Sequence, residues 1–520
     1  MSGPELGSQG RVRAASGGSR LAGTESTAPA LLVDFGSTFT KLTAVDTRSG
    51  TLAGSAQYRT TVESDLMDGF CAGLGQLRAA GMMAAGDGLV LGCSSAGGGL
   101  RVAIVGLERD LTAEAARQVA LNSGGRIVAI LTRGASESLL REVSRSAADL
   151  VLLVGGTDGG DEEFAVGAAR SLALGGIDCP VVFAGNTSAR PRVAAVLDKA
   201  GITWRAAPNV LPQIGRAEVD GVQSVIREAF IEHVIKGKRL SAADRFGEIV
   251  ALPTPDAVLE AVKVVARGYA GLGAPAAPGE PGAPVPAGER GAPALPGKAA
   301  GAGEILVVDV GGATTDVYSS LSARNAASSR SGSLVPAAPV ARTVEADLGL
   351  RWSAEGLVAA ARERRLVTGG EADRLAGAAR QRAADPGFFP QTPQQARDDL
   401  ALARLAVVLA ISRHAGRDHV VLTPAGAEFR RHGRDVRQIQ TVMLTGGVFR
   451  AHAGQGLQGF LKGAFDHADR RHELVPAQVR VVVDSHYILA AVGLLSVRSP
   501  ELALRLVLNT YGEFLRRTDG

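Results

Sequence analysis

The chain has 520 residues, 46% of them hydrophobic, which is enough for two or more domains with ordinary cores. Its 56 Lys and Arg residues nearly balance its 52 Asp and Glu residues, so the charge gives no support to a nucleic-acid-binding protein. Three cysteines without a C-x-x-C pair argue against a disulfide framework and suit a reducing cytosol. The sequence shows no apolar run of membrane-spanning length and no secretory signal, so we expect a cytoplasmic protein without membrane contact.

The chain begins with a segment of biased composition, followed at once by predicted strands. Residues 1–29 are rich in Gly, Ser, Ala and Arg without periodicity, which predicts a disordered tail. Residues 31–60 have the pattern of strand, tight turn and strand, and residues 65–80 have the spacing of an amphipathic helix. We assign residues 30–110 to the N-terminal part of a first lobe.

The middle and the end of the chain are predicted to form a second α/β unit, a loop and a further lobe. Residues 111–240 alternate apolar strands with helices, the pattern of a parallel sheet covered on both faces, and we interpret them as an inserted lobe. Residues 241–270 are expected to be a helical connection. The proline density of residues 271–303 prevents regular structure and predicts a disordered surface loop. Residues 304–520 are assigned to a second lobe, mostly helical over 353–435.

A first glycine-bearing turn, D-F-G-S-T-F-T-K, follows the apolar run that starts at Leu31. Asp34 ends that run, and a carboxylate there suits a hydrated Mg²⁺ ion. Gly36 would let the backbone adopt unusual dihedrals and approach a phosphate. The amides and hydroxyls of Ser37 and Thr38 could donate to phosphate oxygens, and Lys41 could neutralise their charge.

A second turn, D-V-G-G-A-T-T-D, repeats this arrangement much later in the chain. Asp309 ends a strand, where it could orient an attacking water molecule or the metal ion. Gly311 and Gly312 could wrap the other side of a triphosphate, with Thr314 and Thr315 as donors. The carboxylate that follows, Asp316, fits a turn cap as well as a functional role.

A third turn comes late, where a strand runs into Gly446 and Gly447. Its glycines would let an adenine or a ribose lie against the backbone. The order of the three turns resembles the two phosphate motifs and the adenosine motif of the actin, Hsp70 and sugar-kinase superfamily, and the chain has no Walker P-loop. The resemblance implies an α/β, two-lobed actin-like ATPase with duplicated ribonuclease-H-like domains. It also implies ATP and Mg²⁺ as cofactors, with Asp34 and Asp309 as catalytic and metal-binding carboxylates.

Further phrases narrow the resemblance, namely S-S-A-G-G-G-L from Ser94, G-G-A-T-T-D from Gly311, V-E-A-D-L-G-L-R from Val344 and Y-I-L-A-A-V-G-L-L from Tyr487. With these phrases the chain resembles the glutamate mutase accessory protein family (MutL or GlmL of the methylaspartate mutase operon). The resemblance implies an ATP-driven chaperone that reactivates an adenosylcobalamin-dependent mutase, with the mutase subunits as partners. Residues 111–240 are our candidate for the partner-binding surface.

Three other functions compete with this interpretation. A small-molecule kinase of the same fold would use Asp309 as its base, although no sugar-binding pattern is present. An activator of 2-hydroxyacyl-CoA dehydratases would need an iron–sulfur cluster, for which Cys71, Cys93 and Cys179 lack the pattern. A scaffold without turnover is the third. The roles of Glu345 and Asp347 also stay open between a structural turn and contact with the metal or the water, and the basic run at 430–437 is expected to be a solvated helix or loop.

Overall fold

The computed structural model describes residues 29–36, 39–61, 65–83, 88–95, 100–132, 143, 146–235, 244–267, 303–328, 338–423, 426–453, 456–466 and 472–515. Apart from Pro29 and Gly303, the predicted tail and the predicted proline-rich loop lie outside the described residues. Ser37 and Thr38 of the first turn lie outside them as well.

The first lobe is built on a five-stranded sheet of order β10-β4-β1-β2-β3. Its first three strands form an antiparallel meander, β4 runs parallel to β1, and β10 runs parallel to β4. The bounds are β1 (Ala30–Phe35), β2 (Phe39–Val45), β3 (Leu52–Arg59), α1 (Leu66–Ala79), β4 (Val90–Ser94), α7 (Asp244–Ile249), β10 (Val250–Pro253) and α8 (Thr254–Arg267). The segment 241–270, predicted to be a helical connection, therefore also supplies the strand β10. This strand was missed because four residues between two helices are too few to show a strand's alternating pattern.

The second lobe repeats the same plan. Its sheet has the order β13-β12-β11-β16-β17, with an antiparallel meander followed by two parallel strands. The strands are β11 (Ile305–Val310), β12 (Thr315–Ser320), β13 (Val340–Glu345), β16 (Thr441–Thr445) and β17 (Arg480–Val483). Equal strand order and direction in two sheets is the mark of a duplicated domain, so the predicted two-lobed fold is confirmed.

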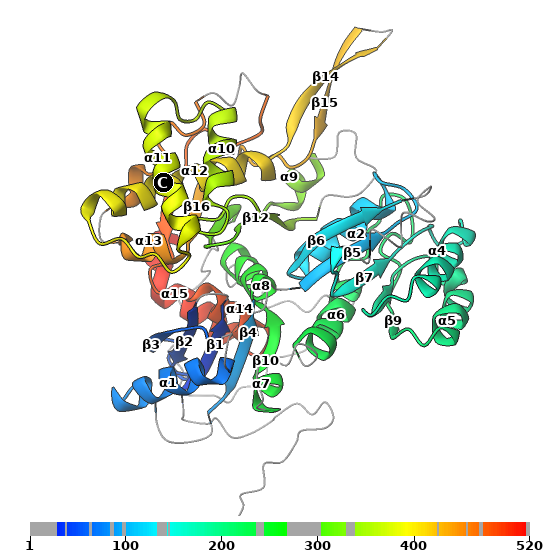
Figure 1. Ribbon diagram of the computed structural model, residues 1–520, viewed down its shortest axis with the longest axis horizontal. Helices are drawn as coiled ribbons and strands as arrows, with labels where there is room; N and C mark the ends of the chain where they lie inside the picture. The colour runs from blue at the N-terminus through cyan, green and yellow to red at the C-terminus, as the bar shows by residue number, and fades with distance from the viewer. Residues whose placement is uncertain are drawn as a thin grey trace, which may run out of the picture.

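Helices α8 and α14 (Leu489–Arg498) pack against one another in the middle of the molecule (Figure 1). One apolar cluster joins them to side chains of both sheets, including Leu32 of β1 and Val307 of β11. Helix α15 (Pro500–Leu515) belongs to the same cluster. The two lobes therefore share one apolar core.

The inserted lobe has a parallel sheet of order β6-β5-β7-β8-β9 (Figure 1). Alternate residues of its strands face two different cores: Ile104 and Leu152 pack with α2 and α6, and Val105 and Leu153 pack with α4 and α5. The bounds are β5 (Leu100–Val105), α2 (Thr112–Asn122), β6 (Gly125–Leu131), β7 (Leu150–Leu153), α4 (Glu163–Leu174), β8 (Val181–Phe183), η2 (Thr187–Ala189), α5 (Arg190–Lys199), β9 (Trp204–Ala206), α6 (Asp220–Ala229) and η3 (Phe230–Ile235). The inserted sheet thus starts at Leu100 and not at residue 111, because a strand's own sequence does not say which sheet it joins.

The rest of the second lobe is helical up to His414 and then differs from the prediction. Its further elements are α9 (Ala323–Ser328), α10 (Ala354–Glu363), α11 (Gly369–Ala384), α12 (Pro393–His414), β14 (Arg417–Thr423), β15 (Gly426–His432), α13 (Gly447–Ala451) and η6 (Leu457–Gly459). Strands β14 and β15 form a two-stranded sheet that stands away from the helices in Figure 1, and Arg417 of β14 also makes an isolated bridge with Glu473. The basic run at 430–437 therefore begins in β15, and after His432 it continues outside any named helix or strand, so the expected loop is present only over 433–437. Arg434 in this loop donates to the carbonyls of Ala338 and Pro339.

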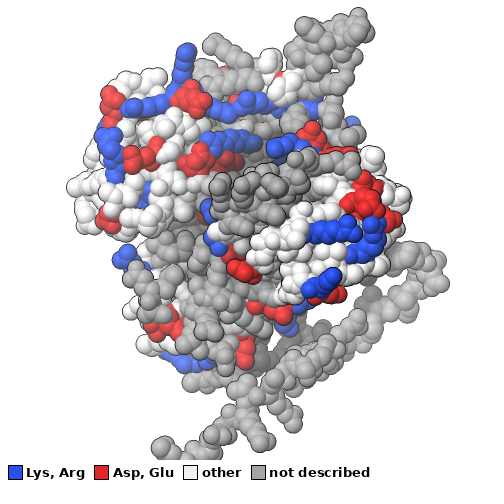
Figure 2. Space-filling view, turned by 45° about the vertical axis from the view of Figure 1, so that its right-hand side comes forward, with Lys and Arg blue, Asp and Glu red and all other residues white. Residues whose placement is uncertain are grey.

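Charged side chains of both signs lie interspersed on the face shown in Figure 2. Within the part of the chain that the structure describes, no helix is long and apolar enough to cross a membrane.

Candidate nucleotide-binding site

The first and second turns join the first two strands of each sheet in the same way. The amide of Gly36 donates to the carbonyl of Phe39 (3.1 Å), and the amide of Gly311 donates to that of Thr314 (2.9 Å). A Cβ atom at Gly36 would lie 2.6 Å from the Phe39 carbonyl oxygen, and the backbone has no positive φ there. Gly36 is therefore required by close approach within the hairpin, and the unusual dihedrals expected from the sequence are not present.

Asp34 is held from three sides at the end of β1. Its side chain is nearly buried, and its Oδ2 atom accepts a hydrogen bond from the Nζ of Lys41 (3.1 Å), which lies opposite it on β2. Its Oδ1 atom accepts from the hydroxyl of Thr254 (2.7 Å), the first residue of α8, and from the thiol of Cys93 (3.7 Å). Both carboxylate oxygens are thus engaged, and the carboxylate fixes the position of Lys41.

Lys41 reaches from the first lobe to residues of the second. Its Nζ lies 4.4 Å from the centre of the Tyr487 ring, just before α14, and the guanidinium of Arg450 lies 5.4 Å from the same ring. Burial alone would lower the pKa of Lys41, but Asp34, Tyr487 and Asp309 outweigh it, and the pKa is raised above its usual range. Lys41 is therefore a fixed positive charge between the two Asp-bearing turns.

Asp309 occupies in β11 the position that Asp34 occupies in β1. Its side chain makes no hydrogen bond or ion pair with another described residue. Burial raises its pKa to about 7; Lys41 opposes that rise, and Asp316, Asp34 and Asp484 add to it. Asp309 is thus a carboxylate that sits among other carboxylates with its oxygens available to a ligand.

The third turn packs against the second. Gly446 has a φ of 125°, and a Cβ atom there would lie 2.4 Å from the Val310 carbonyl oxygen, so only glycine fits this contact. A Cβ atom on Gly447 would lie 3.2 Å from the Tyr487 hydroxyl, whose ring stacks on Lys41 of the first lobe. Tyr487 itself has a φ of 56°, a left-handed backbone that costs about 1–3 kcal/mol in a side-chain-bearing residue. Through this residue the third turn and the first turn meet.

Two threonines that were predicted to donate to phosphate have other partners. The hydroxyl of Thr315 is fully buried and donates to the Leu348 carbonyl (2.7 Å), so its side chain faces the core of the second lobe. The hydroxyl of Thr314 donates to Asp316 (3.1 Å). Both hydroxyls therefore have partners within the protein, and donation from these two residues to phosphate stays a prediction.

The three acidic side chains whose roles the sequence left open are all ion-paired. Glu345 and Asp347 both accept hydrogen bonds from Arg413 (2.9 and 2.6 Å). Asp316, opposite Asp309 on β12, accepts from Arg342 (2.8 and 2.5 Å). These contacts favour structural roles, and none could be foreseen, because the arginines lie on other strands and helices.

Among the residues that the structure describes, no three His, Cys, Asp or Glu side chains gather as a metal-ligand set. Mg²⁺ commonly takes one or two carboxylates and completes its shell with water and substrate phosphates. A single open carboxylate such as Asp309, next to glycine turns that are predicted to bind phosphate, fits that mode of binding.

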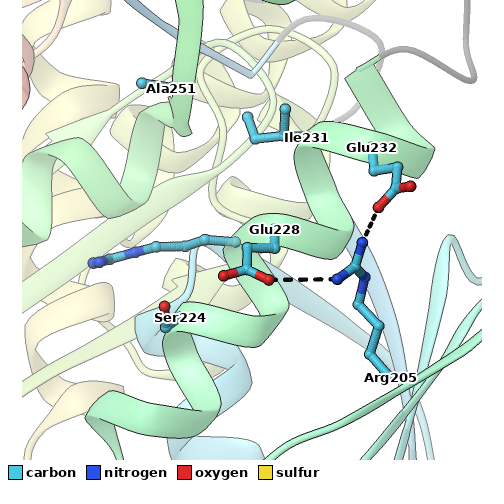
Figure 3. A pocket seen from close by; sticks show the side chains of 7 residues that line it. Arg205, Ser224, Glu228, Ile231, Glu232 and Ala251 are labelled. Carbon is cyan, nitrogen blue, oxygen red and sulfur yellow. Dashed lines mark hydrogen bonds and ion pairs between the residues drawn. The ribbon is translucent and has the colours of Figure 1, made fainter. Parts of the chain in front are cut away.

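A separate pocket lies between the inserted lobe and the first lobe (Figure 3). Its volume is about 520 Å³, and its lining includes Ser224, Ile231 and Ala251. Arg205 of β9 also lines it, on one side, and pairs with Glu228 (3.5 Å) and with Glu232. No residue of the three turns lines this pocket, so it is not part of the candidate nucleotide site.

Comparison with known proteins decides the family. The family model described as "MutL protein" matches residues 30–275 and 281–511. The chain belongs to the MutL protein family. Protein MutL of Clostridium tetanomorphum is 35% identical over 485 residues, which cover 92% of this chain and 98% of that protein. The family resemblance predicted from the sequence phrases is thus confirmed.

This MutL family member was also compared with solved structures. The nucleotide-free structure of acetone carboxylase has a TM-score of 0.36 at 14% identity and covers 90% of this chain and 70% of that one. Xylulose kinase from Bifidobacterium adolescentis has a TM-score of 0.28 at 11% identity, with 92% and 93% covered. The ethanolamine utilization protein EutJ from Carboxydothermus hydrogenoformans has a TM-score of 0.23 at 11% identity, with 92% and 88% covered. These scores are too low to support an argument, and the fold assignment depends on the duplicated sheets.

Proposed function

We propose that the chain binds Mg²⁺-ATP between its two Asp-bearing turns and acts as an ATP-driven accessory factor that reactivates an adenosylcobalamin-dependent mutase. The observation that carries the nucleotide part is the meeting of Asp34, Lys41 and Asp309, which come from two lobes of identical strand order. Membership in the MutL protein family supports the accessory part, because the sequence resembles the accessory proteins of glutamate mutase.

Each charged residue has a distinct role in this proposal. Lys41, held by Asp34, binds the terminal phosphates as a point charge. Asp309 lies where it can hold the metal ion or orient the attacking water, and a pKa near 7 suits a group that accepts a proton at neutral pH. Bound Mg²⁺ would supply positive charge to the β- and γ-phosphate oxygens. The glycine turns contribute backbone amides and the close approach that those amides need.

Nucleotide between the lobes would favour their closed arrangement, and hydrolysis would let them reopen. A mutase that binds one arrangement better than the other would then be held or released, by no more than its differential affinity for the two states. The inserted lobe, here Leu100–Ala229, is the proposed mutase-binding surface. Its deletion should abolish mutase binding and spare nucleotide binding.

The test is recovery of an inactivated adenosylcobalamin-dependent mutase with ATP, fresh cobalamin and either the wild type or Asp309→Ala. Asp373→Ala, at an exposed carboxylate of α11 outside the inserted lobe and the three turns, is the matched control. We expect recovery with the wild type and the control and none with Asp309→Ala, together with ATPase activity that the mutase stimulates. Full recovery with Asp309→Ala would overturn the catalytic assignment, and ATP turnover that depends on a free metabolite would favour the kinase.

A further inference from the structure

The inserted lobe interrupts the first lobe in the sequence and shares an apolar core with it, and it also contacts the second lobe. The chain enters the inserted lobe after β4 and returns to the first sheet at β10. One apolar cluster joins Phe35 and Leu42 of that sheet to Ile104 and Leu152 of the inserted sheet. Its helix α2 also lies against β13, the edge strand of the second lobe's sheet.

The contact with β13 is made by polar groups. The Oδ1 atom of Asn122, the last residue of α2, accepts from the backbone amide of Arg342 (3.1 Å), and its Nδ2 atom donates to the carbonyl of Val340 (3.3 Å). One buried side-chain amide thus pairs with the open edge of β13 as a neighbouring strand would.

The side chain of Arg342 continues the contact toward the nucleotide site. It is 4% exposed, and its Nη1 atom donates to the carbonyls of Leu121 (2.9 Å) and Gly125 (3.0 Å) in the inserted lobe. Its Nε and Nη2 atoms donate to Asp316, which lies opposite Asp309 across the β11–β12 pair. A single guanidinium therefore holds the inserted lobe and the carboxylate next to the second turn.

A second path leads from the same helix end to the first turn. The carbonyl of Asn122 accepts from the side chain of Gln223 (2.9 Å), which also donates to Asp256 (3.0 Å) near the start of α8. Helix α8 begins at Thr254, whose hydroxyl donates to Asp34. The end of α2 is thus linked by hydrogen bonds and one helix turn to both Asp-bearing turns.

We propose that Arg342 is the coupling residue that transmits the nucleotide state of the second turn to the docking of the inserted lobe on β13. This inference depends on the proposed function, since it requires nucleotide between the lobes. The inserted lobe shares an apolar core with the first lobe, so we expect the two to move together. A movement of the first lobe relative to the second would therefore change the polar contact between the inserted lobe and β13. A phosphate group or a metal ion beside Asp309 also changes the electrostatic potential at Asp316. Arg342 is the positively charged side chain that pairs with Asp316, so its contacts would respond to that change.

The test is hydrogen exchange of the full chain, with and without Mg²⁺ and the non-hydrolysable analogue AMP-PNP, read at the peptide spanning Leu121–Gly125. Arg342→Lys keeps the charge and removes the forked donors. Asn122→Ala weakens the same contact from the inserted lobe and leaves Arg342 in place. Arg101→Lys is the control, because Arg101 makes a bidentate pair with Asp149 inside the inserted lobe.

In the wild type and the control, we expect AMP-PNP to change the exchange rate of this peptide by at least about fivefold, the size expected for one or two hydrogen bonds. In Arg342→Lys and Asn122→Ala we expect fast exchange that the nucleotide does not change, with AMP-PNP affinity kept within a few-fold. An unchanged rate in a wild type that binds AMP-PNP would overturn the coupling alone, as would a normal response in both variants. A wild type that binds no nucleotide in calorimetry would overturn the proposed function and the coupling with it.

Discussion

Replacing Asp309 by Asn should make the nucleotide-free protein less sensitive to pH. The pKa of Asp309 is raised from 3.8 to about 7 by burial and by neighbouring carboxylates. A carboxyl group whose pKa is higher in the folded state binds its proton more tightly there, so it lowers the stability of the folded state as the pH rises from about 4 to about 7. Asn carries no such proton and removes this dependence.

The magnitude follows from the interval of pH. Each pH unit between the unfolded and folded pKa values changes the free energy of unfolding by about 1.4 kcal/mol, and about two such units lie between pH 5 and pH 7. Relative to Asp309→Asn, the wild type should therefore lose about 2–3 kcal/mol of stability between pH 5 and pH 8. Most of this loss should occur below pH 7.

The assay is the thermal unfolding midpoint of the nucleotide-free wild type and Asp309→Asn at pH 5 and pH 8. The midpoint of the variant, relative to that of the wild type, should be higher at pH 8 than at pH 5 by a few degrees. Asp373→Asn, at an exposed carboxylate of α11, controls for the loss of a charge. An equal difference between Asp309→Asn and the wild type at both pH values would refute the reasoning, because Asp309 would then ionise as an ordinary surface carboxylate does.

Three further outcomes are expected. Lys41→Met should weaken Mg²⁺-ATP binding by about 10- to 100-fold in calorimetry, because a charged donor to phosphate is lost, and an unchanged affinity would exclude Lys41 from the site. Trp352 is exposed and its amide donates to the Gly312 carbonyl (3.0 Å), so in a Trp204→Phe variant, where Trp352 is the remaining tryptophan, the fluorescence should change on adding Mg²⁺-ATP and change less in EDTA. Unchanged fluorescence in a variant that binds Mg²⁺-ATP would remove the second turn from the site. Gly493→Ala should lower the unfolding midpoint, because its Cβ would lie 1.7 Å from the Ala257 carbonyl oxygen, whereas Gly167→Ala on the open face of α4 should raise it slightly; equal effects would contradict the close packing of α8 and α14.

The sequence was most informative where a few neighbouring residues decide the structure. A strand, an Asp and a glycine turn are encoded within about ten residues, and the positions of Asp34 and Asp309 at the ends of equivalent strands follow from that pattern. The family resemblance could be predicted for the same reason, since it was carried by short contiguous phrases. These parts of the prediction needed no knowledge of which segments meet in space.

The sequence was least informative where distant segments meet. Thr254 lies 220 positions from Asp34 and has no local pattern that points to a carboxylate. Arg342 is one of many arginines, and only the packing of α2 on β13 shows its role. The hairpin of β14 and β15 was missed because its strands are stabilised by each other, and the sheet of Leu100–Val105 was misassigned because strand partners are not encoded in the strand itself.

The central claim is that one nucleotide site is formed by turns from both lobes, and equilibrium binding of Mg²⁺-ATP to the full chain tests it most directly. Calorimetry of the wild type, Lys41→Met in the first lobe and Asp309→Asn in the second should give one site per chain in the wild type and weaker binding in each variant. A wild type that takes up no Mg²⁺-ATP, or variants that both bind it as tightly as the wild type does, would contradict the claim.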